Sequence, residues 1–301
     1  MRTAVPPRRR LATEARFRVE LDLTRLGKWS EEGRFVVTAE HLQQYARATN
    51  DGNPQHAAGQ VAPAAYAVVP GGLAWGALVR KVAVDDGSHR SVHGEHDLYV
   101  EHPIRPGMTL LTQVALVGVH PRSTGTTVTI RANTRDDQGH RLSHQYLTLF
   151  FRGVNAARGA GESPPDHTFP ELLRDRPPLA RVPMRVDADQ SVRYAEASGD
   201  YSSYHLSDRE AQAAGFPRIF LHGLCTMAMA GAGVVQTVCP EDPTRLRRLA
   251  VRFSAIVFPG REITTQLWDL GRDNGRGAYA FEVVDDEGQV VVKNGRAEVA
   301  V

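Results

Sequence analysis

Two short turns in the second half of the chain carry the residues best suited to acid–base chemistry. The first turn, residues 199–205, places Asp200 and His205 five positions apart after a glycine. A carboxylate and an imidazole that share one water molecule can orient it, take its proton and return another, which typically adds about 10² to 10⁴-fold in rate. The alternative is that Asp200 caps a helix and His205 lies in a solvated loop. On the residues alone, both interpretations stay open.

The second turn, Leu221–Leu224, opens a run of apolar and small residues that predicts a helix. The first N–H groups of a helix have no partner within it, and the helix dipole favours negative charge at that end. Gly223 is therefore placed to donate its N–H to an oxygen on which charge develops. Removing one such donor typically costs about 3 to 4 kcal/mol in transition-state stabilisation.

The chain contains an internal repeat that brackets these turns. Tyr45–Asp51 aligns with Tyr194–Asp200 at an offset of 149 positions (194 − 45). Two acidic turns that end in glycine, Asp136–Gly139 and Asp285–Gly288, share that offset. Self-similarity at a fixed period indicates a duplicated structural unit, so we predict two domains of about 150 residues each.

Each half predicts a helix, a longer apolar helix and then several strands, which is an α+β domain with an antiparallel sheet. Thr38 is a good N-cap for the first helix, and Asp187, with Gln190 at the capping-box position, opens its counterpart. The longer helix is predicted at 221–238, and Pro70-Gly71-Gly72 interrupts its first-half equivalent. Strands are predicted at 92–100, 109–117, 126–135, 143–151, 249–253, 262–270, 278–284 and 290–299.

Composition sets the domain boundaries. Residues 153–178 are rich in Gly and Pro, which predicts a linker. Residues 1–15 are expected to form a disordered tail, because they begin with a basic, proline-broken segment. The two domains are therefore predicted at 16–152, which is N-terminal and degenerate, and at 179–301, which is C-terminal and catalytic.

Composition also excludes several classes of function. A net charge of +2, with 42% hydrophobic and 23% charged residues, is typical of a globular protein and gives no basis for binding nucleic acid or a membrane surface. The chain has no run of 18 apolar residues for a transmembrane helix and no apolar segment typical of a signal peptide, so we expect a cytoplasmic protein. Cys225 and Cys239 make no disulfide framework, and we expect Cys225 to be buried.

The two turns resemble the signature of a known family. Tyr194, Ser198-Gly199-Asp200 and His205 match a pattern of an aromatic residue, a spacer and Ser-Gly-Asp-x-Asn-Pro-aliphatic-His. Ile219–Thr226 looks like the Ile-Leu-His-Gly-Leu-Cys-Thr run of the same family. These are the MaoC-like, R-specific enoyl-CoA hydratases, called hydratase 2. The chain departs from them at Ser202-Ser203-Tyr204, where they have Asn, Pro and an aliphatic residue, although Ser202 can still form a hydrogen bond.

The resemblance implies a double hot dog fold, two tandem repeats that each have a long helix wrapped by a bent antiparallel sheet. It implies reversible conversion of trans-2-enoyl thioesters into (3R)-3-hydroxyacyl thioesters, carried on coenzyme A or an acyl carrier protein, in lipid or polyketide metabolism. We expect no cofactor beyond that carrier, no metal ion, no nucleic-acid or membrane partner, and a homodimer. The expected catalytic residues are Asp200, His205, Ser202 and Gly223, and the expected substrate-binding residues are Leu221, His222, Leu224, Tyr204 and, toward a phosphate of coenzyme A, Arg252.

The first half carries a fuller copy of the first turn but lacks the second. Asp51–His56 reads Asp-x-Asn-Pro-x-His, as the family signature does. At the position of His222-Gly223, however, the first half has Ala62-Pro63, and proline has no backbone N–H to donate. We therefore predict that the second half is catalytic. The resemblance implies that the loosened first-half helix leaves room for an acyl chain.

Two other functions stay open. A hot dog thioesterase would hydrolyse the thioester and release free thiol. A catalytically silent subunit would only bind an acyl thioester, and Ser202-Ser203-Tyr204 is the one sequence feature that favours it. The retention of Asp200, His205 and Gly223 together favours an enzyme.

One further histidine cluster suggests metal binding at first sight. His93-Gly94-Glu95-His96 holds two histidines and a glutamate in a predicted strand. Because side chains alternate along a strand, we expect His93 and Glu95 on one face and His96 on the other. The segment is therefore predicted to be structural.

Overall fold

The computed structural model describes residues 21–82, 91–154, 156 and 158–301. The predicted tail at 1–15 lies outside the described residues. The elements of the first half are η1 (Leu23–Arg25), β1 (Gly33–Val36), α1 (Ala39–Ala48), α2 (Pro54–Ala57), η2 (Ala64–Gly71), α3 (Gly72–Val82), β2 (Ser91–Val100), β3 (Thr109–Arg122), β4 (Gly125–Asp136) and β5 (Arg141–Arg152). Those after them are β6 (Ala160–Gly161), η4 (Glu171–Leu173), β7 (Ala180–Arg185), α4 (Gln190–Ser198), η5 (Ser203–His205), α5 (Asp208–Ala213), α6 (Gly223–Val238), η6 (Pro243–Arg245), β8 (Leu246–Phe253), β9 (Glu262–Asp273), β10 (Arg276–Asp285) and β11 (Val290–Ala300).

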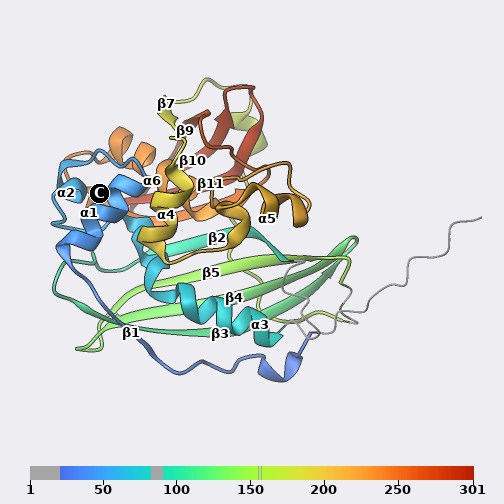
Figure 1. Cartoon of the computed structure of the whole chain (residues 1–301). Coiled ribbons are helices and arrows are strands. Elements are labelled where there is room, and N and C mark those ends of the chain that lie inside the picture. The colour runs from blue at the N-terminus through green and yellow to red at the C-terminus, as the bar shows by residue number, and fades with distance from the viewer. Residues whose placement is uncertain (1–20, 83–90, 155, 157) are drawn as a thin grey trace, which may run out of the picture.

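The strands form one continuous antiparallel sheet with the order β1-β3-β4-β5-β2-β8-β11-β10-β9-β7. β2 pairs with β8 at the centre, where Asp97 faces Ala250 and Leu98 faces Leu249, so the halves join edge to edge (Figure 1). From this seam outward, both halves repeat the same strand order, with β1 and β7 as unpredicted edge strands. Each predicted strand is present, and the duplication, the α+β class and the double hot dog arrangement are confirmed.

The long helix α6 is the core of the second half. Its residues from Cys225 to Val235 are all buried, and it packs against β7, β8, β9 and β11. The sequence permits this close packing because Gly231 and Gly233 have no side chains: a Cβ on Gly231 would lie 2.8 Å from Leu249. Cys225 is buried, as expected. Among the described helices, none is long and apolar enough to cross a membrane.

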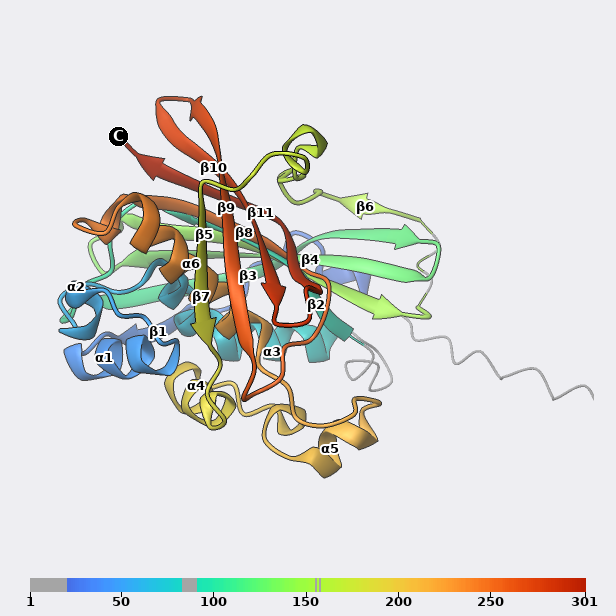
Figure 2. The same cartoon turned by 90° about the horizontal axis from the view of Figure 1, so that it is seen from above.

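The equivalent helix of the first half is divided, as the sequence predicted. A 3-10 segment, η2, contains Pro70 and passes at Gly72 into α3, which lies against β3 (Figures 1 and 2). Proline cannot donate the backbone hydrogen bond that an uninterrupted helix needs at this point. η2 nevertheless begins as α6 does: its N-cap is Pro63, with φ −53° and ψ 144°, and that of α6 is His222, with φ −58° and ψ 134°. The structure therefore aligns Pro63 with His222, so the predicted alignment of Pro63 with Gly223 is wrong by one residue.

The first helices of the two halves begin differently. The Thr38 side chain accepts from the His41 N–H at 3.1 Å, which confirms it as the N-cap of α1. The predicted cap at Asp187 is wrong, because α4 begins at Gln190 with Asp189 as its N-cap. Half of the expected capping box is still formed: the Gln190 side chain accepts from the Asp187 N–H at 3.0 Å.

The predicted strand alternation at His93 and His96 is also wrong. The register of β2 shifts between His93 and Glu95, and a β-bulge resets the alternation of side chains. The rings of His93 and His96 therefore meet with their centroids 5.4 Å apart. His96 is fully buried, and its Nε2–H donates to the Gln145 side-chain oxygen at 2.8 Å. Burial lowers the pKa of His96 to about 4.

The predicted linker, residues 153–178, packs on the two halves. Within it, β6 pairs with β3, and η4 places Leu173 against the sheet. Phe169 and Leu173 join Trp268 and Ala280 in a small second core. The Gly- and Pro-rich composition predicted the connection but not this packing.

Candidate active site

Three chain reversals assemble the site. α4 ends at Gly199, whose φ of 77° suits glycine, and the turn directs Asp200 out of the helix. The short helix η5 then carries His205, and the turn before α6 carries His222 and Gly223. One donor atom from each of Asp200, His205 and His222 lies within 4.8 Å of the others, so residues up to 22 positions apart converge on one point.

Ser202 holds the carboxylate of Asp200 in place. Asp200 Oδ1 accepts from the Ser202 N–H at 3.1 Å and from the Ser202 Oγ–H at 2.6 Å. Asp200 is exposed, whereas His205 and His222 are buried at 6% and 2% exposure. Asp200 thus lies at the exposed side of a buried pair of imidazoles, with Oδ1 occupied by the Ser202 donors.

Backbone carbonyl groups fix the protonation of both imidazoles. His205 Nδ1 lies 2.8 Å from the Phe220 oxygen, and His222 Nε2 lies 3.0 Å from the Asp200 backbone oxygen. A carbonyl oxygen only accepts, so each of these ring nitrogens carries the proton. His205 Nε2 and His222 Nδ1 are left unprotonated. The two rings lie against each other with centroids 3.8 Å apart and planes 32° apart.

The electrostatics give a carboxylate beside two neutral imidazoles. Burial lowers the pKa of His205 to about 3, assisted by His222, and burial also lowers the pKa of His222. Asp200 is exposed as a residue, but its carboxyl group is partly desolvated, which alone would raise its pKa. The interaction with His222 and the two hydrogen bonds from Ser202 outweigh it, so the pKa of Asp200 is below its usual value. Near neutral pH, Asp200 is therefore ionised and both imidazoles are uncharged.

The start of α6 offers a free backbone donor beside this group. Gly223 is the first residue of the helix, and no side chain caps the helix end. Within the described part of the chain, the Gly223 N–H has no hydrogen-bond acceptor. The Phe253 ring covers the other side of Gly223, where an added Cβ would lie 3.3 Å from ring atoms.

The residues expected to bind substrate differ in where the structure places them. Tyr204 is partly exposed beside the site, stacked on Phe220 at 5.7 Å, and Leu224 is half-buried at the start of α6. Leu221 is instead buried in the core and donates its N–H to the Val257 oxygen, so it supports the turn from below. Arg252 lies on β8, 49% exposed, and its guanidinium pairs with Glu95 at 3.2 Å.

Sequence reasoning missed several groups that shape the site. The Phe220 carbonyl orients His205, and the Phe253 ring closes over Gly223. His222 was expected only as a substrate contact, yet its ring packs directly on His205. Phe220 lies within the family-like run and so could be suspected from sequence, but no local pattern indicates that Phe253 approaches Gly223.

The equivalent turn in the first half is closed. His56 Nδ1 and Asp51 Oδ2 lie 2.7 Å apart, and both side chains are buried, at 2% and 4% exposure. The adjoining cavity, lined in part by Pro63 and Gly231, has a volume of about 10 Å³. A single water molecule needs about that much space, so a thioester cannot reach the buried His56 through this cavity. Asp51 also borders a larger cavity on its other side, but that cavity is not lined by His56.

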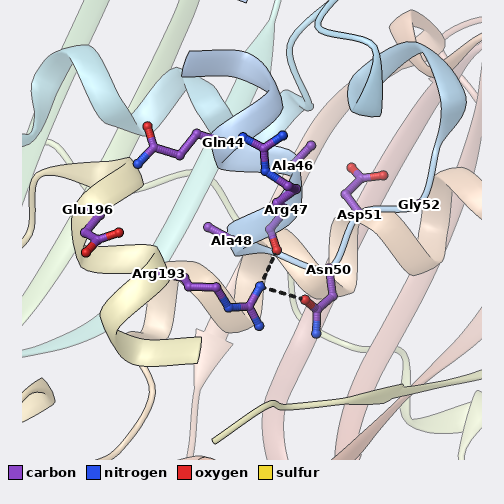
Figure 3. A pocket seen from close by; sticks show the side chains of 9 residues that line it. All are labelled: Gln44, Ala46, Arg47, Ala48, Asn50, Asp51, Gly52, Arg193 and Glu196. Carbon is purple, nitrogen blue, oxygen red and sulfur yellow. Dashed lines mark hydrogen bonds between the residues drawn. The ribbon is translucent and has the colours of Figure 1, made fainter. Parts of the chain in front are cut away.

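A larger cavity of about 470 Å³ lies between α1 and α4, away from Asp200 and His205 (Figure 3). Arg193 reaches across it from α4 and donates to the Arg47 carbonyl at 2.6 Å and to the Asn50 side chain at 3.3 Å. Arg193 also pairs with Asp187 and Asp189. These contacts tie the first helices of the two halves together.

Comparison with known proteins places the chain in a family. The model of the MaoC like domain matches residues 172–290, and that of the FAS1-like dehydratase domain region matches residues 24–145. 3-hydroxyacyl-thioester dehydratase Y of Mycobacterium tuberculosis is 31% identical over 215 residues, which cover 69% of this chain and 72% of that protein. The chain belongs to the MaoC-like dehydratase family.

Two further relatives fit this assignment. A probable enoyl-CoA hydratase 2 of Dictyostelium discoideum is 28% identical over 180 residues, and the match spans 60% of either protein, less than two thirds of the relative's length. A crystal structure of a MaoC-like dehydratase from Phytophthora capsici superposes with a TM-score of 0.77. It is 24% identical, and the match covers 90% of this chain and 94% of that one, so it supports the fold.

Proposed function

We propose that this protein catalyses the reversible hydration of trans-2-enoyl thioesters to (3R)-3-hydroxyacyl thioesters. The observation that carries the proposal is the convergence of Asp200 and His205 with His222, which is followed directly by the unpaired Gly223 N–H at the start of α6. Relatives named as enoyl-CoA hydratase and 3-hydroxyacyl-thioester dehydratase support the same reaction. The acyl group is carried by coenzyme A or an acyl carrier protein, and no other cofactor takes part.

The proposed mechanism adds one water molecule across the double bond. Asp200 and His205 hold the water, one of them takes a proton from it, and its oxygen bonds to Cβ. The Gly223 N–H donates to the thioester oxygen as enolate character develops. A proton then returns to Cα on the same face, so the net change is addition of H and OH. Ser202 is a positioning residue that keeps the Asp200 carboxylate turned toward the water.

Substrate binding is proposed for the residues around this point. Tyr204, Leu224 and His222 border the acyl thioester, with Leu221 packed beneath them. Arg252 is proposed to meet a phosphate of coenzyme A, which requires it to release Glu95. A homodimer and a cytoplasmic location stay predictions, to be tested by light scattering and by cell fractionation.

The deciding experiment follows the ultraviolet absorbance of the conjugated enoyl thioester, with crotonyl-CoA and a longer trans-2-enoyl-CoA as substrates. We expect loss of absorbance without release of thiol, and a fall of at least about 10²-fold in kcat for Asp200→Asn and for His205→Ala. Circular dichroism checks that both variants are folded. Release of thiol would identify a thioesterase, and thioester binding without turnover on coenzyme A or carrier-protein substrates would identify a silent subunit.

The first-half turn supplies a matched control. His56→Gln changes the equivalent histidine in a closed, buried pair, so we expect kcat to stay within about twofold of the wild type. If His56→Gln lost activity as severely as His205→Ala while remaining folded, the assignment of catalysis to the second half would be wrong.

A further inference from the structure

Asp200, His205 and His222 together form the kind of donor set that binds zinc. Two imidazoles and a carboxylate, with the remaining position left to water, are a ligand set typical of open zinc sites. The donor atoms lie within 4.8 Å of one another. Zinc bonds of about 2.0–2.2 Å require closer donors. Asp200 lies at the exposed side of the cluster, so binding of the ion would draw its Oδ2 inward while Oδ1 keeps the Ser202 donors.

The hydrogen bonds around the imidazoles match the surroundings of metal-bound histidines. Metal-ligating histidines almost always donate their other N–H to a carboxylate or a backbone carbonyl, which fixes the tautomer. Here His205 donates through Nδ1 to the Phe220 carbonyl, and His222 donates through Nε2 to the Asp200 carbonyl. Each ring therefore keeps one unprotonated nitrogen, and Asp200 Oδ2 receives none of the Ser202 hydrogen bonds.

A separate observation points to a ligand at this cluster. His222 is 2% exposed, and its Nδ1 is buried without a hydrogen-bond partner in the described residues. A buried acceptor without a partner destabilises the folded protein. The proposed hydration reaction gives this nitrogen no role, because Asp200, His205 and Gly223 supply the groups that the reaction needs. A cation that bonds to it would remove this destabilisation.

We propose that Asp200, His205 and His222 bind one divalent transition-metal ion, Zn²⁺, and that the bound ion inhibits the enzyme. The ion would take the His205 lone pair and the Asp200 oxygen that otherwise hold the water molecule. Binding of metal and binding of that water therefore exclude each other. The inhibition rests on the proposed hydratase function, whereas the binding does not.

The test measures zinc binding directly by isothermal titration calorimetry on protein stripped with EDTA. We expect one equivalent of Zn²⁺ per chain, with affinity at least about tenfold lower in His222→Ala and in Asp200→Asn. His222→Gln is a second variant in case His222→Ala fails to fold. His140→Gln is the control, because His140 and Asp136 form an exposed pair at 3.0 Å elsewhere on the molecule.

Two results would overturn the proposal: no binding to the wild type, or binding that the His222 and Asp200 variants leave unchanged. Activity then separates this proposal from the proposed function. Hydratase activity that is inhibited by Zn²⁺ and restored by EDTA supports both. If the protein binds one equivalent of Zn²⁺ but has no hydratase activity, the metal site is supported and the proposed function is rejected. If the protein is an active hydratase that binds no Zn²⁺, the proposed function is supported and the metal site is rejected.

Discussion

At the scale of single residues, Ser202 shows how a departure from the family pattern is accommodated. The resemblance implies Asn at this position, and here the Ser202 hydroxyl donates to the Asp200 carboxylate at 2.6 Å. The Ser202 N–H provides a second bond, at 3.1 Å, that does not depend on the side chain. Hydrogen bonds to charged groups contribute about 1.5–3 kcal/mol, so the hydroxyl has a measurable effect on the orientation of Asp200.

We predict that Ser202→Ala lowers kcat about tenfold with little change in stability, because it removes one of the two bonds that orient the carboxylate. Ser202→Thr keeps the hydroxyl and is expected to retain most of the activity. Steady-state kinetics with an enoyl-CoA substrate measures both variants. An unchanged kcat in Ser202→Ala would mean that the backbone N–H alone positions Asp200.

At the scale of elements, the first residue of α6 provides the backbone N–H that the proposed reaction uses. His222 has φ −58° and ψ 134°, an extended conformation that directs the chain into the first turn of the helix. That conformation is also the one favoured before proline, and proline is well tolerated at the first helical position. The Gly223 N–H can therefore be removed without breaking the helix.

We predict that Gly223→Pro lowers kcat by about 10² to 10³-fold, because it removes the donor to the thioester oxygen. Gly223→Ala is the matched control, because it keeps the N–H but adds the Cβ that proline also adds, 3.3 Å from atoms of the Phe253 ring. The two variants are compared by kcat and by thermal unfolding. An equal loss of activity in both would attribute the effect to crowding against Phe253 and exclude the donor.

At the scale of the whole molecule, the pairing of β2 with β8 joins the two repeats into one continuous sheet. Arg248 on β8 makes bonds of 3.0 and 2.8 Å to the Asp97 carboxylate on β2 and one of 3.0 Å to Glu298. Asp97 is 2% exposed and Arg248 is 8% exposed, so this ion pair crosses the seam out of reach of solvent. A second pair across the same seam, Arg252 with Glu95, is exposed.

We predict that Arg248→Met lowers the free energy of unfolding by about 3–5 kcal/mol, because it leaves the Asp97 charge buried without a partner. Arg252→Met breaks the exposed pair on the same two strands and is expected to cost less than about 1 kcal/mol. Urea unfolding measures both. An equal loss in the free energy of unfolding would show that the burial of Asp97 does not explain the contribution of the Arg248 pair.

The sequence by itself determined the duplication, the α+β class, every strand of the sheet except β1, β6 and β7, and the break in the first-half helix at Pro70. It also predicted Asp200, Ser202, His205 and Gly223 as site residues. These features depend on patterns that are local in the chain: alternation along a strand, glycine and proline at turns, and a fixed spacing within one signature.

Only the tertiary structure decided the contacts between segments that are distant in sequence. It stacked His222 on His205, brought Phe253 over Gly223, and closed the Asp51–His56 turn although its signature is the fuller one. The bulge in β2 and the pairing of β2 with β8 belong here as well. Each depends on how side chains fill the space between packed elements, and a local pattern contains no information about the neighbour on the other side of that space.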